Sequence, residues 1–284
     1  TIPPLLYSIV HRPYKILWDL DIWPETLKAV NVVSSKIIIN LIENFVKKIY
    51  LYYDVVLAGS ESFMQIIKTR YSGKIEYFPN WAEKVIESDP KEYKDKYHIP
   101  CDKFIIMYTG NIGEAQNFDS LIKTIKILDN KIHWVFVGDG RFKNKFKNIC
   151  NTEKINDKVT FISQIHIDKI PSVVNYADAL FLSLKNKKIF HKTVPAKLQT
   201  YMALGKPIIA VIKGEGADII RKSNCGVVEE NYDYSRLAIS INNFVNKHKK
   251  DIEILGLNGR EFYLKKFNSE IRKKQLYKLI DEKF

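Results

Sequence analysis

Two glycine-containing turns are the first candidates for chemistry in this sequence. Gly110, Asn111 and Gly113 follow one short apolar stretch, and Gly138 and Gly140 follow the next. Glycine lets backbone N–H groups approach an anion closely, and a helix that begins just afterwards adds about half a positive charge at its N-terminus. Either turn alone is compatible with a simple tight turn. Together, after consecutive strands of one sheet, they would face the same crevice and favour a nucleotide site.

Lys197 is the candidate cation for that site. The stretch 194–207 has the pattern of a helix, with Pro195 in the first turn and Gly205 as the C-terminal cap. Lys197 would then lie in the first turn, where the helix dipole disfavours a positive charge. A bound anion nearby would explain a lysine at this position, and a solvated surface lysine is the alternative.

These residues need a scaffold, and the hydrophobic pattern predicts one of alternating strands and helices. Short apolar stretches predict strands at 15–20, 55–58, 74–77, 104–108, 133–137, 159–162, 179–182 and 207–211. Longer periodic segments predict helices that include 34–53, 118–128, 196–204 and 236–249. This alternation is typical of parallel sheets covered by helices on both faces. We therefore expect an α/β fold with both glycine turns at the carboxyl end of one sheet.

The predicted joint between two domains lies at Pro79 and Asn80, which end a short strand. A polar stretch follows as far as Tyr97 before the next strand begins. The sequence opens at Thr1 without a methionine and enters a predicted strand almost at once, so we expect the start to lie within a fold. We expect three parts: a partial N-terminal domain at 1–79, a second domain at 80–258, and C-terminal helices at 259–284 that pack back toward the first domain.

Composition restricts the class of protein. Of the 284 residues, 46% are hydrophobic and 27% are charged, which excludes wholesale disorder. The net charge is +13, either because the protein meets anionic partners or because scattered lysines merely cover its surface. Nucleic-acid binders carry a similar charge, but the sequence contains no recognisable nucleic-acid-binding module, so we expect no nucleic acid partner.

The cysteines and the apolar runs bear on location. Cys101, Cys150 and Cys225 are far apart and form no C-x-x-C pair, which argues for a reducing compartment and against a disulfide framework or a zinc site. The sequence has no signal peptide and no apolar run of about 18 residues. We expect a cytoplasmic protein without a membrane-spanning segment.

The order of the motifs resembles that of a known enzyme family. The sequence is similar to retaining-type family-4 glycosyltransferases of the GT-B fold, most of all to bacterial members that transfer amino sugars such as N-acetylfucosamine during O-antigen or capsule assembly. The resemblance covers nearly the whole chain. It rests on DIWPE at 21–25, FPNWAE at 78–83, GNIG at 110–113, VGDGR at 137–141, KVTFIS at 158–163, YADALFLSL at 176–184 and PAKLQTYMALGKPIIA at 195–210.

The resemblance implies two facing Rossmann-like domains, the first incomplete, with a uridine-based nucleotide diphosphate sugar on the second. The glycine turns would face the diphosphate through their backbone, Lys197 would neutralise it, and the turn at Ser163 and Gln164 would contact the base. Protein cations and helix dipoles meet the charge of the leaving diphosphate in such enzymes, so we expect no metal and no other cofactor. The implied donor-binding residues are Gly110, Asn111, Gly113, Gln116, Gly138, Gly140, Ser163, Gln164, Lys197 and Thr200.

Several positions depart from the family pattern. The family commonly has two glutamates eight positions apart, where this sequence has Lys192 and Thr200. An Arg and a Lys after the first glycine turn fall on the uncharged Asn111 and Gln116. These changes transfer more of the phosphate contact to Lys197 and leave the stereochemical outcome, retention or inversion, open. The resemblance also implies further residues of the acceptor domain before the first residue of this sequence.

Asp21 and Glu25 are the candidate catalytic residues on the acceptor side. Asp21 would lie just past the end of a predicted strand, where it could face the cleft between the domains and take a proton from an acceptor hydroxyl. The alternative is that Asp21 caps a helix that begins near Pro24, because aspartate favours that position.

The sequence favours a glycosyltransferase that moves a sugar from a nucleotide donor to a glycan or lipid-linked acceptor. The segment 34–53 is apolar and carries lysines, so it is either a core helix or a surface that lies on an anionic membrane. Two other functions stay open. One is a nucleotide-sugar epimerase of the same fold, and the other is a non-catalytic partner subunit that binds sugar nucleotides, which the lost glutamates favour.

Overall fold

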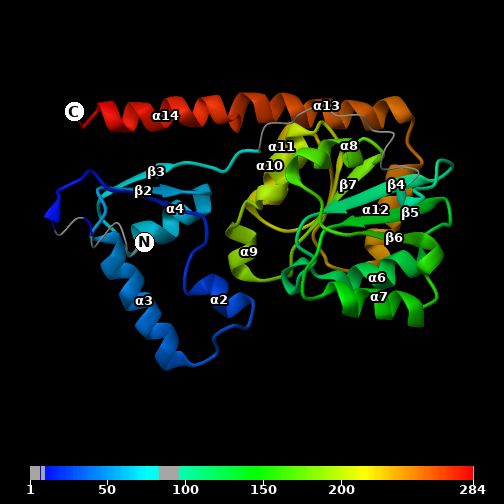
Figure 1. Cartoon of the computed structure of the whole chain (residues 1–284), viewed down its shortest axis with the longest axis horizontal. Coiled ribbons are helices and arrows are strands. Elements are labelled where there is room, and N and C mark those ends of the chain that lie inside the picture. Colours follow the sequence, from blue (N-terminus) through cyan, green and yellow to red (C-terminus); the bar gives the residue numbers. More distant parts are fainter. Residues whose placement is uncertain (1–6, 8–9, 83–95, 284) are drawn as a thin grey trace.

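The computed structural model describes residues 7, 10–82 and 96–283, and it contains two parallel sheets side by side (Figure 1). A three-stranded sheet is built from the N-terminal part of the chain, and a six-stranded sheet from the part that follows. Helices connect successive strands in both units. Parallel strands need such crossover connections, which are almost always right-handed. The prediction of an α/β fold with two Rossmann-like units is confirmed.

The first sheet has the strand order β1-β2-β3, with all strands parallel. Its strands are β1 (Ile16–Asp19), β2 (Val55–Ala58) and β3 (Lys74–Tyr77), and its helices are α2 (Glu25–Ala29), α3 (Lys36–Tyr50) and α4 (Glu61–Lys68). The register pairs Asp19 with Ala58 and Ala58 with Tyr77, so the three strands end at the same edge. That edge faces the second unit.

The second sheet is parallel and has the strand order β6-β5-β4-β7-β8-β9. Its strands are β4 (Phe104–Thr109), β5 (Ile132–Val137), β6 (Val159–Ile162), β7 (Ala179–Ser183), β8 (Ile208–Val211) and β9 (Gly226–Glu229). The chain extends the sheet in one direction from β4 to β6 and in the other from β7 to β9. Ligands of such sheets bind outside the carboxyl ends of the strands at the point where the direction changes.

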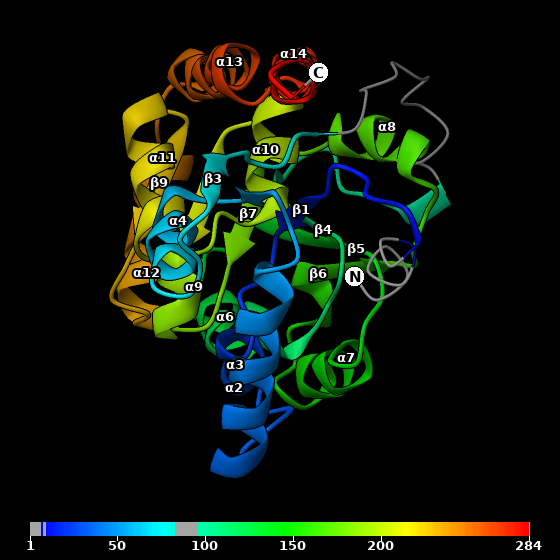
Figure 2. The same ribbon diagram turned by 90° about the vertical axis from the view of Figure 1, so that its left-hand side faces the viewer.

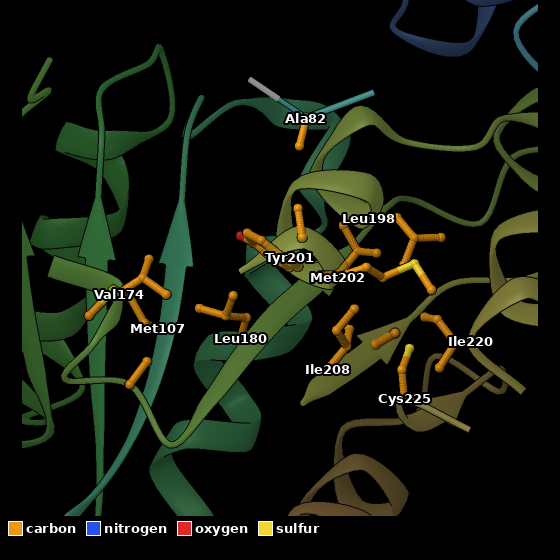
Figure 3. Packing of buried hydrophobic residues seen from close by; sticks show 14 of the residues in the cluster. Ala82, Met107, Val174, Leu180, Leu198, Tyr201, Met202, Ile208, Ile220 and Cys225 are labelled. Carbon is orange, nitrogen blue, oxygen red and sulfur yellow. The ribbon is translucent and has the colours of Figure 1, made fainter. Parts of the chain in front are cut away.

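Helices cover both faces of the second sheet, which explains why its strands are almost continuously apolar. One face carries α6 (Phe118–Ile127), α7 (Lys143–Thr152) and α12 (Tyr234–Val245). The other carries α8 (Ile170–Val174), α10 (Ala196–Ala203), α11 (Glu215–Ser223) and α13 (Lys249–Lys266). In Figure 3, Leu198, Tyr201 and Met202 of α10 pack over Leu180 and Ile208 of the sheet. This packing fixes α10 at the strand ends, where Lys197 lies.

The last two helices form a long rod that runs across both units (Figure 1). α13 packs against α10, where Gly256 approaches the backbone of Gly205. α14 (Ser269–Asp281) returns to the first sheet, where Leu279 is buried with Val55 and Leu57 and the Gln275 amide donates to the Tyr77 carbonyl at 2.8 Å. The break between the helices lies at Phe267 and Asn268, so the expected boundary at 259 falls inside α13.

α3 is only partly covered by the rest of the protein. Its last turns bury Val46 and Tyr50, while Ile37, Leu41 and Phe45 are 74%, 63% and 54% exposed. Both views show it pointing away from α13 and α14 (Figures 1 and 2). The C-terminal end of the helix therefore belongs to the core, and the first ten residues present an apolar face to solvent. No helix within the described ranges is long and apolar enough to cross a lipid bilayer.

Candidate functional site

The two glycine turns lie against each other at the ends of β4 and β5. The Gly110 amide donates to the Val137 carbonyl at 2.8 Å, and the Ile112 amide donates to the Asp139 carbonyl at 2.7 Å. Gly138 has a φ of +143°, and a Cβ built on it would lie 2.1 Å from the Gly110 carbonyl oxygen. A side chain at position 138 would therefore separate the turns, and only glycine allows this contact.

A pocket of about 490 Å³ opens between these turns and the segment after β6. Its polar walls come from Gly110, Asn111, Gly138, Asp139, Gly140 and Gln164. Ile165, Ile167 and Ile170 supply an apolar wall on the side of β6. Ser163 is exposed directly before Gln164 but does not line the pocket. The structure thus brings together five of the donor-binding residues predicted from the sequence.

Lys197 reaches the first glycine turn because α10 is attached to the end of β4. The Thr109 amide donates to the Tyr201 hydroxyl at 3.0 Å, and Tyr201 lies one helical turn after Lys197 on the same face of α10. A Cβ built on Gly110 would lie 2.8 Å from Lys197 Cε and 3.3 Å from its Nζ. The amine is also 5.3 Å from the centre of the Tyr108 ring.

The charge of Lys197 is unbalanced. Its amine forms no hydrogen bond or ion pair with any residue that the structure describes, and burial lowers the pKa of Lys197. A half-buried ammonium group without a counter-ion is costly, and an anion bound beside Gly110 would remove that cost. The arrangement is suited to a diphosphate.

Lys143 is a second cation of the site, and the sequence reasoning missed it. It is buried at the start of α7, donates from Nζ to the Gly138 carbonyl at 2.7 Å and lies 3.7 Å from the Asp139 carboxylate. The Asp139 side chain also accepts from the Gly140 amide at 2.7 Å. Lys143 therefore stiffens the second glycine turn. The spacing of four residues between Asp139 and Lys143, directly after the turn, is the signal that could have indicated it.

Gln116, Gly113 and Thr200 are engaged within the protein. The Gln116 side-chain oxygen accepts from the Gly113 amide at 3.0 Å, which closes the first glycine turn around the short helical segment η1 (Glu114–Gln116). The Thr200 hydroxyl donates to the Ala196 carbonyl at 3.2 Å within α10. None of the three lines the pocket. In this structure Gln116 and Gly113 hold the shape of the first glycine turn, whose residues Gly110 and Asn111 line the pocket.

The acceptor-side candidates differ in their availability. Asp21 is exposed just beyond β1, but the protein around its carboxyl desolvates it enough to raise its pKa. α2 begins after Pro24 without a side-chain cap, so Asp21 does not cap this helix. Glu25 is tied to Arg70 by an ion pair, and Arg70 also donates to the Trp23 carbonyl at 2.9 Å. Asp21 is therefore the freer carboxylate of the pair.

Asp19 is a carboxylate that the sequence reasoning passed over, because it lies inside the predicted strand. It is the last residue of β1 and accepts a hydrogen bond from the Tyr50 hydroxyl. Burial raises the pKa of Asp19 to about 6. Only the packing of α3 against β1 reveals this pair, since the two residues are far apart in the chain.

Direct contacts join the two units at the carboxyl ends of their strands. The Glu215 carboxylate, at the start of α11, accepts from the backbone amides of Glu61 and Ser62, both at 2.8 Å. The Ser60 hydroxyl donates to the Lys192 carbonyl at 2.6 Å, at the end of α9 (Lys188–Lys192). The acceptor-side carboxylates thus lie on the edge that faces the donor-side unit. Within the described part of the chain, no cluster of three or more His, Cys, Asp and Glu side chains is arranged to hold a metal ion.

Known proteins share this sequence pattern and this architecture. The family model for glycosyl transferases group 1 matches residues 89–262. WcaI of Escherichia coli K12, which carries the name of a colanic acid biosynthesis glycosyl transferase, is 26% identical over 135 residues, or 45% of this chain and 33% of its own length. The capsular polysaccharide biosynthesis glycosyltransferase CapM of Staphylococcus aureus is 22% identical over 198 residues, which cover 64% of this chain and 47% of CapM.

Solved structures with the same fold extend the comparison. The Anabaena protein Alr3699/HepE, solved in complex with UDP and glucose, has a TM-score of 0.76 at 15% identity and covers 99% of this chain and 74% of its own. At this identity the likeness concerns the fold. The chain spans between a third and a half of the length of the two curated relatives above. Because the family model covers more than half of the chain, the protein belongs to the group 1 glycosyl transferases.

Proposed function

We propose that the protein binds a uridine diphosphate amino sugar in the pocket between the two glycine turns and transfers the sugar to a glycan or lipid-linked acceptor in surface polysaccharide assembly. The observation that carries this proposal is the amine of Lys197, which lies beside Gly110 with no counter-ion among the described residues. A diphosphate supplies that counter-ion, and its negative charge grows when the bond to the sugar breaks.

Backbone groups support the same ligand. The amides of Gly110, Ile112 and Gly113 already have acceptors within the protein, whereas the Asn111 amide has none among the described residues. This amide and the Lys197 amine would act together on the diphosphate. Because backbone and lysine donors meet the charge of the leaving group, the reaction as proposed uses no metal and no other cofactor.

The choice of donor rests on the pocket wall and on related proteins. Gln164 next to three isoleucines offers polar and apolar contacts to a planar base. Uridine is favoured because the Anabaena protein of the same fold was solved with UDP and glucose and also with UDP-glucose. The amino sugar and the acceptor class follow from the resemblance to O-antigen and capsule transferases.

Asp21 is the proposed proton acceptor for the attacking hydroxyl. It lies at the strand edge that faces the second unit, it is exposed, and it is not used as a helix cap. Glu25, held by Arg70, would contact the acceptor rather than take its proton. A general base that is well placed contributes about 100- to 10,000-fold to the rate.

Contact with a membrane is part of the proposal for a lipid-linked acceptor. The first ten residues of α3 expose Ile37, Leu41 and Phe45, and Lys36 lies at its start. An apolar face with basic residues binds to anionic lipid surfaces. The protein would then work at the inner face of the cytoplasmic membrane.

Nucleotide binding tests the proposal directly. A UDP-sugar at about 100 times its dissociation constant adds about 2.7 kcal/mol to the free energy of unfolding, which raises the Tm by on the order of 5 °C. We expect Lys197→Ala to abolish most of this rise. Lys250→Ala is the matched control, because Lys250 is an exposed lysine in the first turn of α13 and should leave the rise unchanged. If the UDP-sugar raised the Tm of Lys197→Ala as much as that of the unaltered protein, the proposed diphosphate site beside Gly110 would be wrong.

A further inference from the structure

A second pocket, of about 350 Å³, lies between α2 of the first unit and α9 of the second. Four lysines line it, Lys28 from α2 and Lys187, Lys188 and Lys192 from α9 and the residue before it, together with one carboxylate, Glu25. The pocket is separate from the one between the glycine turns, since the two share no lining residue.

The lysines of this pocket outnumber its acidic groups. None of the four forms an ion pair with a residue that the structure describes. The one carboxylate, Glu25, is already paired with Arg70. Cations concentrated in a crevice attract anions and raise the local concentration of an anionic ligand. A neutral ligand would leave these four ammonium groups to repel one another.

Glu25 adds a hydrogen-bond acceptor to the pocket. One of its carboxylate oxygens, Oε1, binds Arg70, and the side chain is 33% exposed where it lines the pocket. A carboxylate accepts from more than one donor. A hydroxyl group in the pocket can therefore donate to Glu25. The pocket thus suits a ligand with both hydroxyl groups and a negative charge.

The pocket lies close to both sides of the candidate active site. Ala29 and Ile189, which line it, belong to an apolar cluster that also contacts Ala115 and Leu184. Ala115 is part of η1, which follows the first glycine turn directly, and its carbonyl accepts from the Lys185 amide at 2.7 Å. On the other side, Asp21 is four residues before Glu25. The pocket thus adjoins the segment after the first glycine turn, and its residue Glu25 belongs to the same stretch of chain as Asp21.

We infer that this pocket binds an acidic sugar unit of the acceptor, with its carboxylate or phosphate on Lys187, Lys188 and Lys192 and a hydroxyl on Glu25. The inference rests on the proposed function, because it treats the ligand as the acceptor of the transfer. It assigns an anionic glycan as the acceptor class. This inference also explains why lysine stands at position 192, where the family commonly has glutamate. A carboxylate at that position would repel an anionic acceptor.

Three small sugars serve as probes in a titration followed by ligand-observed NMR: methyl glucuronide, glucose 6-phosphate and the neutral methyl glucoside. We expect at least one of the anionic sugars to bind the unaltered protein about tenfold more tightly than methyl glucoside. Tighter binding of methyl glucuronide would identify a carboxylate as the recognised group, and tighter binding of glucose 6-phosphate would identify a phosphate. The preference should disappear in the triple variant Lys187→Gln, Lys188→Gln, Lys192→Gln.

The control variant carries Lys247→Gln, Lys250→Gln and Lys274→Gln, which remove the same charge from exposed sites elsewhere and should retain the preference. The thermal shift with UDP, measured on the triple variant, shows that it is folded and that its donor pocket is intact. Equal binding of all three sugars to the unaltered protein, or a preference that survives in the triple variant, would overturn the inference. Anionic sugar binding without any uridine nucleotide binding would instead overturn the proposed transfer.

Discussion

The donor side and the acceptor side of this protein hold their functional groups in different ways. On the donor side, the two glycine turns share backbone hydrogen bonds, and Lys143 and Tyr201 fix their surroundings. On the acceptor side, Asp21 and the pocket lysines Lys187, Lys188 and Lys192 are exposed and form no ion pair with a described residue. The difference suits the proposed ligands, because nucleoside diphosphate sugars share one diphosphate group, whereas acceptors vary in shape and charge.

The largest effect is expected from a side chain between the glycine turns. Gly138→Ala places a Cβ 2.1 Å from the Gly110 carbonyl oxygen at a φ of +143°. We expect the free energy of unfolding to fall by about 3 kcal/mol and nucleotide binding to be lost. Urea unfolding and UDP titration measure both. Gly216→Ala is the control, since Gly216 is in α11 and a Cβ there would meet only flexible side-chain and ring atoms closer than 3.6 Å.

If Gly138→Ala bound UDP as tightly as the unaltered protein, the donor side would be no more rigid than the acceptor side. The comparison between the two sides would then lose its structural basis.

A smaller effect is expected from loosening α10. Tyr201→Phe removes the hydroxyl that accepts from the Thr109 amide and leaves this amide unsatisfied, which costs about 1–3 kcal/mol of stability. Because this contact also holds Lys197 beside Gly110, we expect UDP affinity to fall severalfold. Tyr277→Phe, at an exposed tyrosine of α14, should change neither quantity. Reduced stability with full UDP affinity would mean that Lys197 is positioned by something other than Tyr201.

The smallest effect is expected on the acceptor side, and it depends on pH. Burial raises the pKa of Asp19 from 3.8 to about 6, so its contribution to stability is fully present below pH 3.8 and is lost as the pH rises through 6. Asp19→Asn keeps a neutral acceptor for Tyr50. Relative to the unaltered protein, the variant should gain on the order of 1 kcal/mol in unfolding free energy between about pH 4 and about pH 7.

Unfolding in urea across this pH range checks the expectation, with the exposed Asp119→Asn as the control. Parallel pH profiles for Asp19→Asn and the unaltered protein would show that the Asp19 carboxyl titrates as in the unfolded chain.

Most of the fold and part of the site could be predicted from the sequence, because their signals are local. Apolar runs of four to six residues mark the strands, and Gly110, Gly138 and Lys197 are recognisable from what surrounds them in the chain. The short strand β9 and the helix α9 have weaker patterns and were not predicted. The role of Asp19 and the pocket lined by Lys28, Lys187, Lys188 and Lys192 depend on segments that meet only after folding, whereas Lys143 is close in sequence to the turn that it contacts. Sequence spacing carries no information about such contacts.

The two places where the chain passes between the units lie next to each other. Trp81 and Phe78 end the first unit in a group of packed rings, Ala82 already belongs to the core of the second, and the Arg272 guanidinium lies 5.9 Å from the centre of the Phe78 ring. Because the crossings are adjacent, an opening of the molecule would pivot near them, parting Glu215 from the start of α4 while Gln275 stays bonded to Tyr77. The space between the units would then widen on the side opposite the two crossings.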